Sequence, residues 1–223
     1  MVTASSAAVG RLPAVLVTGF DPFGGAAVNP SWQAVQALHG RRIAGHRIVA
    51  AQLPTVFDES LLVLRGLLRS HRPALAICTG QAGGRAALSL ERVAINVNDA
   101  RIADNALAQP VDTPVIPGGP AAYFSSLPIK AMLAALEGEG VRCEVSQTAG
   151  TFVCNHVFYG LMHELATRRE FAGVRGGLIH VPWLPEQGQP SMALDDIVRG
   201  LQAAIRCALA TGADIRRQAG ALN

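Results

Sequence analysis

The segment AGTFVCNH, residues 149–156, contains a cysteine whose surroundings suit either a core residue or a nucleophile. Free cysteine is among the most buried residue types, and Cys154 has apolar neighbours. Residues 148–151, however, are typical of a turn that enters a helix, which places Cys154 in or near the first helical turn. There the helix dipole and the free N–H groups favour a thiolate, and the same groups can stabilise an oxyanion. The segment by itself leaves both interpretations open.

A thiolate nucleophile requires a base that accepts its proton and later protonates the leaving group. On a helix, His156 would point about 200° away from Cys154, and His163 lies too far along the same helix. Three other histidines adjoin predicted helix ends or turns in polar segments, where we expect them to be solvated: His39, His46 and His71. His180 follows the apolar residues 176–179 at the end of a predicted strand, which suits a catalytic base but also a capping or core histidine.

A third residue would orient the imidazole of such a base. Glu91 is a carboxylate inside the apolar segment LSLERVAINV, residues 88–97, and buried carboxylates are rare unless they are paired. Neighbouring residues of a strand point to opposite faces, so we do not expect Glu91 to pair with Arg92. Asp104, in ARIADN, is a second candidate, although loop aspartates are commonly structural. The pattern alone leaves Glu91, Asp104 and a solvent-facing edge strand as alternatives.

Two glycine-rich segments follow predicted strands and are candidates for a ligand pocket. TGFDPFGG, residues 18–25, matches neither of the glycine patterns that bind phosphates, GxGxxG and GxxxxGK[ST]. Only 5% of the residues are aromatic, so Phe20 and Phe23 in this loop indicate a flat apolar wall, or else side chains that fold back onto the core. GQAGGR, residues 80–85, would let the backbone approach a ligand closely, or is simply a tight turn.

Short apolar strands that alternate with helices are expected to position these segments. Strands are predicted over residues 14–19, 47–52, 74–79, 88–97, 141–146 and 176–182. Helices are predicted over residues 29–39, 57–70, 127–138, 154–168 and 191–210, with a loop over 99–119. This alternation is typical of a single-domain α/β/α sandwich, in which helices cover both faces of a twisted, mostly parallel sheet. Ligands bind at the carboxyl ends of such strands, so we expect the glycine-rich segments, the turn before Cys154 and the segment around His180 to meet there.

The composition bounds the size and the compartment of the protein. A chain of 223 residues that is 50% hydrophobic fits one domain. We expect this domain over residues 14–216, between a flexible extension, 1–13, and a loose tail, 217–223. The extension lacks the features of a secretory signal, and no run of 18 apolar residues predicts a membrane span. The formal charge of +3 comes without a basic block, which argues against nucleic acid as a partner. These features favour a cytoplasmic protein.

The cysteines and the single lysine argue against further kinds of site. The four cysteines are scattered without CxxC spacing, which argues against a zinc site and a disulfide framework: Cys78, Cys143, Cys154 and Cys207. Reduced thiols are therefore expected. Lys130, the only lysine, lies inside a predicted helix, so Schiff-base, P-loop and Ser-Lys chemistry are not expected.

Four segments, in this order, resemble the pyroglutamyl peptidase I (pyrrolidone-carboxylate peptidase) family, cysteine peptidases that remove an N-terminal pyroglutamate. They are LVTGFDPFGGAAVNPSWQAV, GQAGGRAALSLERVAINVNDARIADN, TAGTFVCNHVFYG and GGLIHVPWLPEQ. The resemblance extends from about Val15 to Gln187, and weakly beyond. It implies that the catalytic cysteine is Cys154, the catalytic histidine His180 and the orienting glutamate Glu91.

The resemblance also implies a pyroglutamate pocket. Its residues would be Phe20, Phe23, Asn29, Gln81, Phe152 and Val153. Pyroglutamate is a neutral, flat lactam, so its site needs aromatic walls and a donor and an acceptor for the lactam C=O and N–H. The family further implies a cytoplasmic thiol protease that forms a homotetramer, needs no metal or cofactor, and acts on peptides with an N-terminal pyroglutamate.

The chain departs from the usual family pattern at two positions beside the site. Leu90 replaces the proline of TPER, next to Glu91, and Ala103 replaces the proline of ARIPDN, next to Asp104. Neither change removes a catalytic group. Two alternatives to a peptidase remain. One is a catalytically silent protein that binds lactam-capped peptides or small cyclic amides. The other is a nucleoside phosphorylase-like enzyme, whose phosphate site would have to use Arg85.

Overall fold

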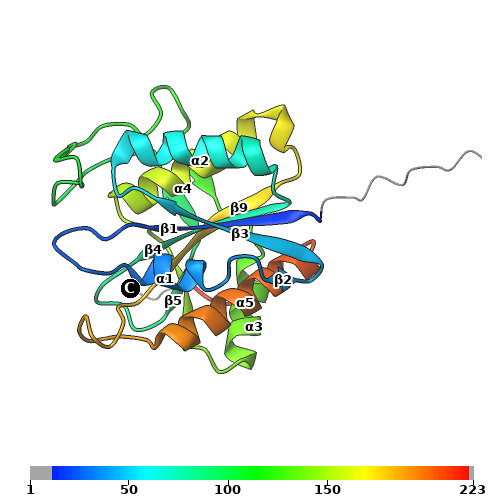
Figure 1. Cartoon of the computed structure of the whole chain (residues 1–223). Coiled ribbons are helices and arrows are strands. Elements are labelled where there is room, and N and C mark those ends of the chain that lie inside the picture. Colours follow the sequence, from blue (N-terminus) through cyan, green and yellow to red (C-terminus); the bar gives the residue numbers. More distant parts are fainter. Residues whose placement is uncertain (1–11, 221–223) are drawn as a thin grey trace, which may run out of the picture.

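A seven-stranded twisted sheet forms the centre of the structure, a computed structural model that describes residues 12–220 (Figure 1). Its strands are β1 (Ala14–Phe20), β2 (Arg42–Ile43), β3 (His46–Leu53), β4 (Leu75–Gln81), β5 (Leu88–Glu91), β8 (Cys143–Ser146) and β9 (Arg175–Val181). Their order in space is β2-β3-β1-β4-β9-β5-β8. The strands β3, β1, β4 and β9 run parallel, whereas β5 is antiparallel to β9 and parallel to β8. The predicted mostly parallel sheet is confirmed, with reversals towards both edges, where β2 is antiparallel to β3 and β5 is antiparallel to β9.

The α-helices within residues 12–220 cover the two faces of this sheet (Figure 1). One face carries α1 (Pro30–Gln36), α3 (Ile129–Gly138) and α5 (Leu194–Ala210), and the other carries α2 (Phe57–His71) and α4 (Val153–Thr167). The central strands are buried on both faces, because alternate side chains of a strand enter different cores. Val15 and Val17 of β1 belong to the core under α1, α3 and α5, and Leu16 belongs to the core under α2 and α4. The predicted α/β/α sandwich is confirmed.

The segment 88–97, predicted as one strand, is divided between two sheets. β5 takes its first four residues, whereas β6 (Val93–Ile95) pairs with β7 (Ala122–Phe124) in a separate two-stranded sheet. The prediction of a single strand is therefore wrong. Asn155 of α4 stabilises the division, because its side-chain amide hydrogen-bonds both the N–H and the carbonyl of Ile95. This contact joins residues 60 apart in the chain, so a local apolar pattern does not reveal it.

The ends of the chain are only partly covered by the described residues. Residues 1–11 of the proposed extension, and residues 221–223 of the proposed tail, lie outside them. Arg217, inside the tail, forms an ion pair with Glu137 of α3 at 2.6 Å, and its carbonyl accepts a hydrogen bond from Nζ of Lys130 at 2.8 Å. These contacts attach this part of the tail to α3. Between residues 12 and 220, no helix combines the length and hydropathy that crossing a membrane requires.

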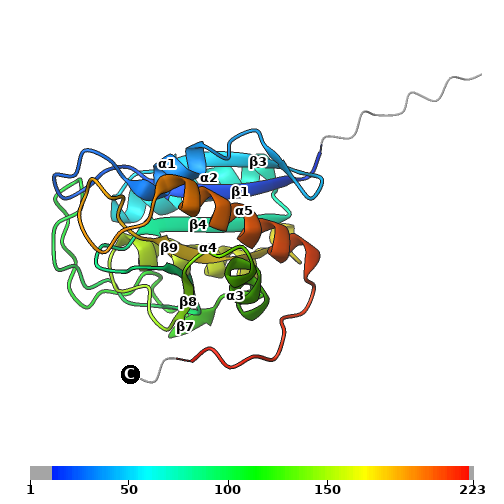
Figure 2. The same ribbon diagram turned by 90° about the horizontal axis from the view of Figure 1, so that it is seen from below.

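The loops that follow β1, β4 and β9 gather at one end of the sheet, on the left of Figures 1 and 2. This is the carboxyl end of these parallel strands. The loop 99–119 and the turn before α4 reach the same end, as Figure 2 shows from a second direction. The predicted meeting of the glycine-rich segments with the segments around Cys154 and His180 is confirmed, and it creates the candidate site.

Candidate active site

A cavity of about 410 Å³ opens at this carboxyl end. Eight of the nine predicted site residues line it: Phe20, Phe23, Asn29, Gln81, Phe152, Val153, Cys154 and His180. The ninth, Glu91, is completely buried and contacts His180. The cavity has seven further lining residues that were not predicted individually, although five of them belong to GQAGGR or to the turn before Cys154: Thr55, Ala82, Gly83, Arg85, Arg101, Ala149 and Gly150. The structure therefore brings all nine predicted residues together.

Cys154 is the second residue of α4 and so lies in the first helical turn, as predicted. The turn before it is fixed by hydrogen bonds: the N–H of Gly150 donates to Oγ1 of Thr148 at 3.0 Å, and Oγ1 of Thr151 donates to a loop carbonyl at 2.7 Å. Gly150 has a φ of 76°, a backbone angle that residues with a Cβ atom rarely adopt. Cys154 is only partly buried and lines the cavity, which favours the nucleophile over the core residue.

The side chains of Cys154 and His180 meet above Gly80, the first glycine of GQAGGR. A Cβ atom built at this position would lie 2.6 Å from Sγ of Cys154 and 3.3 Å from Nε2 of His180. Contacts this short leave no room for any side chain at residue 80. At this position GQAGGR lets the backbone approach a sulfur atom and an imidazole closely; its expected close approach to a ligand stays a prediction.

His180 and Glu91 form a buried hydrogen-bonded pair. Nδ1 of His180 lies 2.7 Å from Oε1 of Glu91, and the side chains are 5% and 0% exposed. The strand register explains the contact, because Ser89 of β5 stands opposite His180 of β9. Glu91 lies two residues beyond Ser89 and so points to the same face of the sheet.

The pKa values of the pair are shifted in opposite directions. Burial alone would lower the pKa of His180, but the charge of Cys154 and a hydrogen bond with it, followed by those of Glu91, raise this pKa to about 9. Burial alone would raise the pKa of Glu91, but hydrogen bonding with His180 and its charge, with smaller contributions from Ser146 and Arg85, hold it below its ordinary value. The shifts favour an imidazolium at His180 in contact with the carboxylate of Glu91.

Asp104, the alternative partner of His180, has a different role. Its Oδ2 accepts a hydrogen bond from the N–H of Phe57, at the start of α2, at 3.0 Å. Its Oδ1 accepts from the N–H groups of Ala106 and Ala108 at 2.9 and 2.8 Å. Asp104 therefore holds its loop against a helix start, as expected of a structural aspartate, and Glu91 is the carboxylate in contact with His180.

His156 and His163 lie on faces of α4 that do not line the cavity, as the helix geometry predicts. Nδ1 of His156 is 2.9 Å from Oδ1 of Asn98, and burial lowers the pKa of this histidine to about 4. Nδ1 of His163 is 3.0 Å from the hydroxyl of Tyr123. Both imidazoles thus contact groups other than Cys154, which leaves His180 as its histidine.

Aromatic rings form one wall of the cavity. The ring centroids of Phe23 and Phe152 are 5.9 Å apart, and Phe57 packs edge-on against Phe152 with centroids 5.4 Å apart. Phe20 is only 2% exposed and also lines the cavity, so it belongs both to the core and to the cavity wall. Phe23 therefore agrees with the pocket-wall interpretation of TGFDPFGG, and Phe20 agrees with both the pocket wall and the core.

Asn29 lines the cavity, but its side chain already has partners inside its own loop. Its Oδ1 accepts hydrogen bonds from the N–H and the hydroxyl of Ser31, at 3.0 and 2.8 Å, and its Nδ2 donates to the carbonyl of Asp21 at 3.0 Å. Asn29 is the N-cap of α1, as its position before Pro30 predicts. We infer that it shapes the loop that carries Phe23.

The amide of Gln81 is oriented by Gln187, whose contact the sequence pattern did not indicate. The N–H of Leu184 donates to Oε1 of Gln187 at 3.0 Å, so Nε2 of Gln187 faces acceptors. These are the carbonyl of Val28, at 3.4 Å, and Oε1 of Gln81, at 3.1 Å. Because Oε1 of Gln81 is held in this way, its Nε2 is the atom left to face the cavity. Gln187 is the last residue of the family segment GGLIHVPWLPEQ, and this position was the only feature of the sequence that could have indicated its role.

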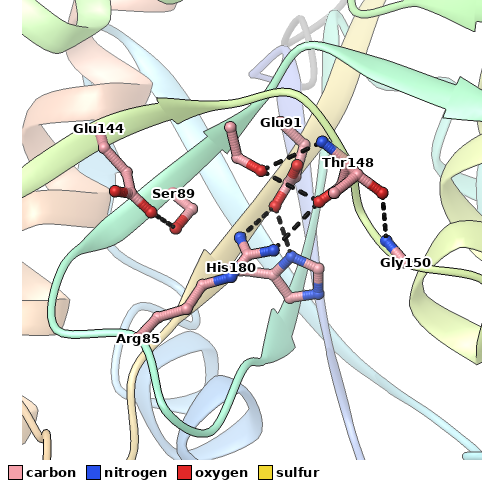
Figure 3. Close-up of polar contacts among 8 residues, drawn as sticks. Arg85, Ser89, Glu91, Glu144, Thr148, Gly150 and His180 are labelled. Carbon is pink, nitrogen blue, oxygen red and sulfur yellow. Dashed lines mark hydrogen bonds and ion pairs between the residues drawn. The ribbon is translucent and has the colours of Figure 1, made fainter. Parts of the chain in front are cut away.

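Arg85 is the second residue whose role the sequence did not indicate. Figure 3 shows its guanidinium between Glu91 and Thr148. Nη1 donates to Oε1 of Glu91 at 2.6 Å, and Nη2 donates to the carbonyl of Thr148 at 3.0 Å. Arg92, the chain neighbour of Glu91, instead donates from Nε to Gln147 at 2.9 Å, so the prediction that Glu91 and Arg92 do not pair is confirmed.

Comparison with known proteins agrees with this geometry. The sequence model of the pyroglutamyl peptidase family matches residues 13–211. The chain is 60% identical to pyrrolidone-carboxylate peptidase 1 of Ralstonia nicotianae and 58% identical to the pyrrolidone-carboxylate peptidase of Cupriavidus taiwanensis, over 95% of this chain and 100% of each relative.

Solved structures give the same result. A crystal structure of pyroglutamyl peptidase I from Bacillus amyloliquefaciens has a TM-score of 0.88 at 51% identity and covers 91% of this chain and 100% of its own. A mutant pyrrolidone carboxyl peptidase from Pyrococcus furiosus has a TM-score of 0.85 at 39% identity, over 88% of this chain and 98% of its own. The sequence match and the shared fold each extend over most of the chain, and it therefore belongs to the pyroglutamyl peptidase family of cysteine peptidases.

Proposed function

We propose that this pyroglutamyl peptidase removes N-terminal pyroglutamate from peptides through a thioester at Cys154. The supporting observation is the combination of a Cys154–His180–Glu91 array with a cavity whose lining contains no Asp or Glu, within residues 12–220. Ordinary aminopeptidases need a carboxylate to bind a free α-ammonium group. A cavity without one, walled by Phe23 and Phe152, suits the neutral, flat lactam of pyroglutamate.

The proposed reaction begins with His180 as an imidazolium and Cys154 as a thiolate, the thiol proton having passed to Nε2 of His180. The sulfur attacks the pyroglutamyl carbonyl carbon, and free N–H groups at the start of α4 stabilise the oxyanion. The imidazolium then protonates the leaving amine as the C–N bond breaks, which leaves a thioester. Water, deprotonated by His180, hydrolyses the thioester and releases pyroglutamic acid. Glu91 orients His180 and stabilises its cation throughout.

Turnover of a pyroglutamyl-anilide tests this function, with a prolyl-anilide as the control. The prolyl group has a similar ring but carries a positive charge and lacks the lactam carbonyl. We expect its kcat/KM to be lower by about 10³-fold or more, because cavity donors would be left unpaired. A thiol-blocking reagent should remove the activity on pyroglutamyl-anilide. Equal turnover of both anilides, or turnover that survives the thiol blocker, would contradict the proposal.

Gln81 is proposed to donate from Nε2 to the lactam carbonyl, with Gln187 fixing its orientation. In Gln187→Glu the new carboxylate can only accept hydrogen bonds, so Gln81 must turn its Nε2 towards residue 187 and its Oε1 towards the cavity. We expect KM for pyroglutamyl-anilide to rise about 10- to 100-fold with kcat nearly unchanged, since binding is lost equally in the ground and transition states.

The control for this substitution is Gln189→Glu, which adds the same charge two residues away. Gln189 is exposed, and its Nε2 donates to Ser191, so this variant should keep the wild-type KM. Steady-state kinetics of both variants decide the matter. A wild-type KM in Gln187→Glu, or an equal rise in both variants, would show that Gln187 does not orient the substrate contact.

The two alternative functions are less well supported by the geometry. A phosphorylase would need a cation for phosphate, but both ends of the Arg85 guanidinium are bonded to Glu91 and Thr148. A protein that only binds its ligand does not require a cysteine thiol placed beside a histidine, as Cys154 and His180 are placed at Gly80. A covalent adduct of Cys154 with a thiol-reactive pyroglutamyl analogue would separate a peptidase from a binding protein.

A homotetramer and a cytoplasmic location are further proposals, which rest on the resemblance to the family. All four cysteines of the chain lie within the described residues and are free thiols, which fits a reducing compartment. Light scattering after size-exclusion chromatography tests the assembly. A mass of four chains would support the tetramer, and a mass of one chain would contradict it.

A further inference from the structure

We infer that Arg85 is a positioning residue, which sets Glu91 and the turn before Cys154 in place relative to each other. The inference rests on the proposed thioester mechanism. Arg85 comes from the loop after β4, Glu91 from the end of β5, and Thr148 from the segment that leads into α4. One guanidinium thus links Glu91, at the end of β5, to the segment that leads into α4 and Cys154 (Figure 3).

The contact with Glu91 uses the same oxygen that His180 contacts. Oε1 of Glu91 accepts from Nη1 of Arg85 at 2.6 Å and faces Nδ1 of His180 at 2.7 Å. Glu91 is 0% exposed, whereas Arg85 is 27% exposed. A carboxylate that is buried away from solvent needs an opposite charge nearby to remain ionised. Arg85 supplies a permanent positive charge. Because its side chain is partly exposed, the guanidinium itself retains some hydration.

The contact with Thr148 acts on the nucleophile. The carbonyl of Thr148 accepts from Nη2 of Arg85, and Oγ1 of the same residue accepts from the N–H of Gly150. The chain then enters α4 at Val153 and reaches Cys154. A planar guanidinium donates in fixed directions, so the positions of Glu91 and Thr148 depend on each other. Loss of this link is expected to disturb the alignment of Cys154 with His180.

The test uses Arg85→Met, with Arg92→Met as the matched control. Arg92 adjoins Glu91, and its guanidinium contacts Gln147, the neighbour of Thr148, so it lies close by but outside the link. For Arg85→Met we expect kcat on pyroglutamyl-anilide to fall about 100-fold while KM changes little. The acid limb of the kcat/KM pH profile should move to higher pH, because Glu91 then keeps a proton to higher pH. Arg92→Met should retain the wild-type profile.

A purely structural role of Arg85 would lower activity without moving the acid limb. Arg85→Ala with added ethylguanidinium keeps the inference testable where the methionine variant folds poorly: the ion should fill the vacated space and restore at least part of kcat. An unmoved acid limb, whether or not kcat falls, or an Arg85→Ala variant that folds but gains nothing from ethylguanidinium, would overturn the inference. Absence of wild-type activity on pyroglutamyl-anilide would instead contradict the proposed function itself.

Discussion

Cys154→Ala is expected to fold normally and to release no product from pyroglutamyl-anilide. The loss of kcat/KM should be on the order of 10⁴-fold or more, because the proposed acyl-enzyme cannot form without the sulfur. Folding should be preserved, since Cys154 is only partly buried and stands at a helix start. Initial rates and thermal unfolding, measured on the same preparation, give the two readouts.

Cys207→Ala is the matched control for this substitution. Cys207 is also a partly buried free thiol on a helix, but it lies on α5, outside the residues that line the cavity. It should keep the wild-type rate and should remain sensitive to a thiol blocker through Cys154. Residual activity of Cys154→Ala close to that of the wild type would remove the nucleophile from the proposed mechanism.

Glu91→Gln is expected to lower kcat by about 10²- to 10⁴-fold. The amide can donate to Nδ1 of His180, which would leave Nε2 protonated and unable to accept the thiol proton. The pH profile should change as well. The pKa of His180 is raised to about 9 partly by Glu91, so without the carboxylate the imidazolium loses its proton at lower pH. The alkaline limb of kcat/KM, near pH 9 in the wild type by this assignment, should therefore move down.

Glu144→Gln supplies the control for the loss of a carboxylate. Glu144 lies on β8, is exposed, and accepts a hydrogen bond from Ser89 at 2.7 Å, so its replacement removes a nearby charge without touching His180. We expect wild-type kcat and an unmoved alkaline limb. If Glu91→Gln and Glu144→Gln showed the same profile, Glu91 would have no specific part in holding the imidazolium.

Most of the elements that carry the site could be predicted from local pattern. The apolar segments 14–19, 74–79 and 176–182 became β1, β4 and β9, and the turn at 148–151 correctly placed Cys154 at a helix start. These predictions succeeded because strand burial and helix entry are encoded within a few neighbouring residues. The prediction for the segment 88–97 failed because residues 93–95 pair with β7 and Ile95 is hydrogen-bonded to Asn155, and neither partner is a neighbour in the chain.

The amino-acid sequence alone determined the residue types of the site and, through its four family segments, the nine residues to look for. Only the tertiary structure decided that Glu91 contacts His180, whereas Asp104 accepts a hydrogen bond from the start of α2. It also decided that Arg85 contacts Glu91 and that Gln187 contacts Gln81. The physical reason is distance along the chain: Glu91 and His180 are 89 residues apart, and Gln81 and Gln187 are 106 apart. Hydrogen bonds of this kind depend on strand order and register, which no local pattern contains.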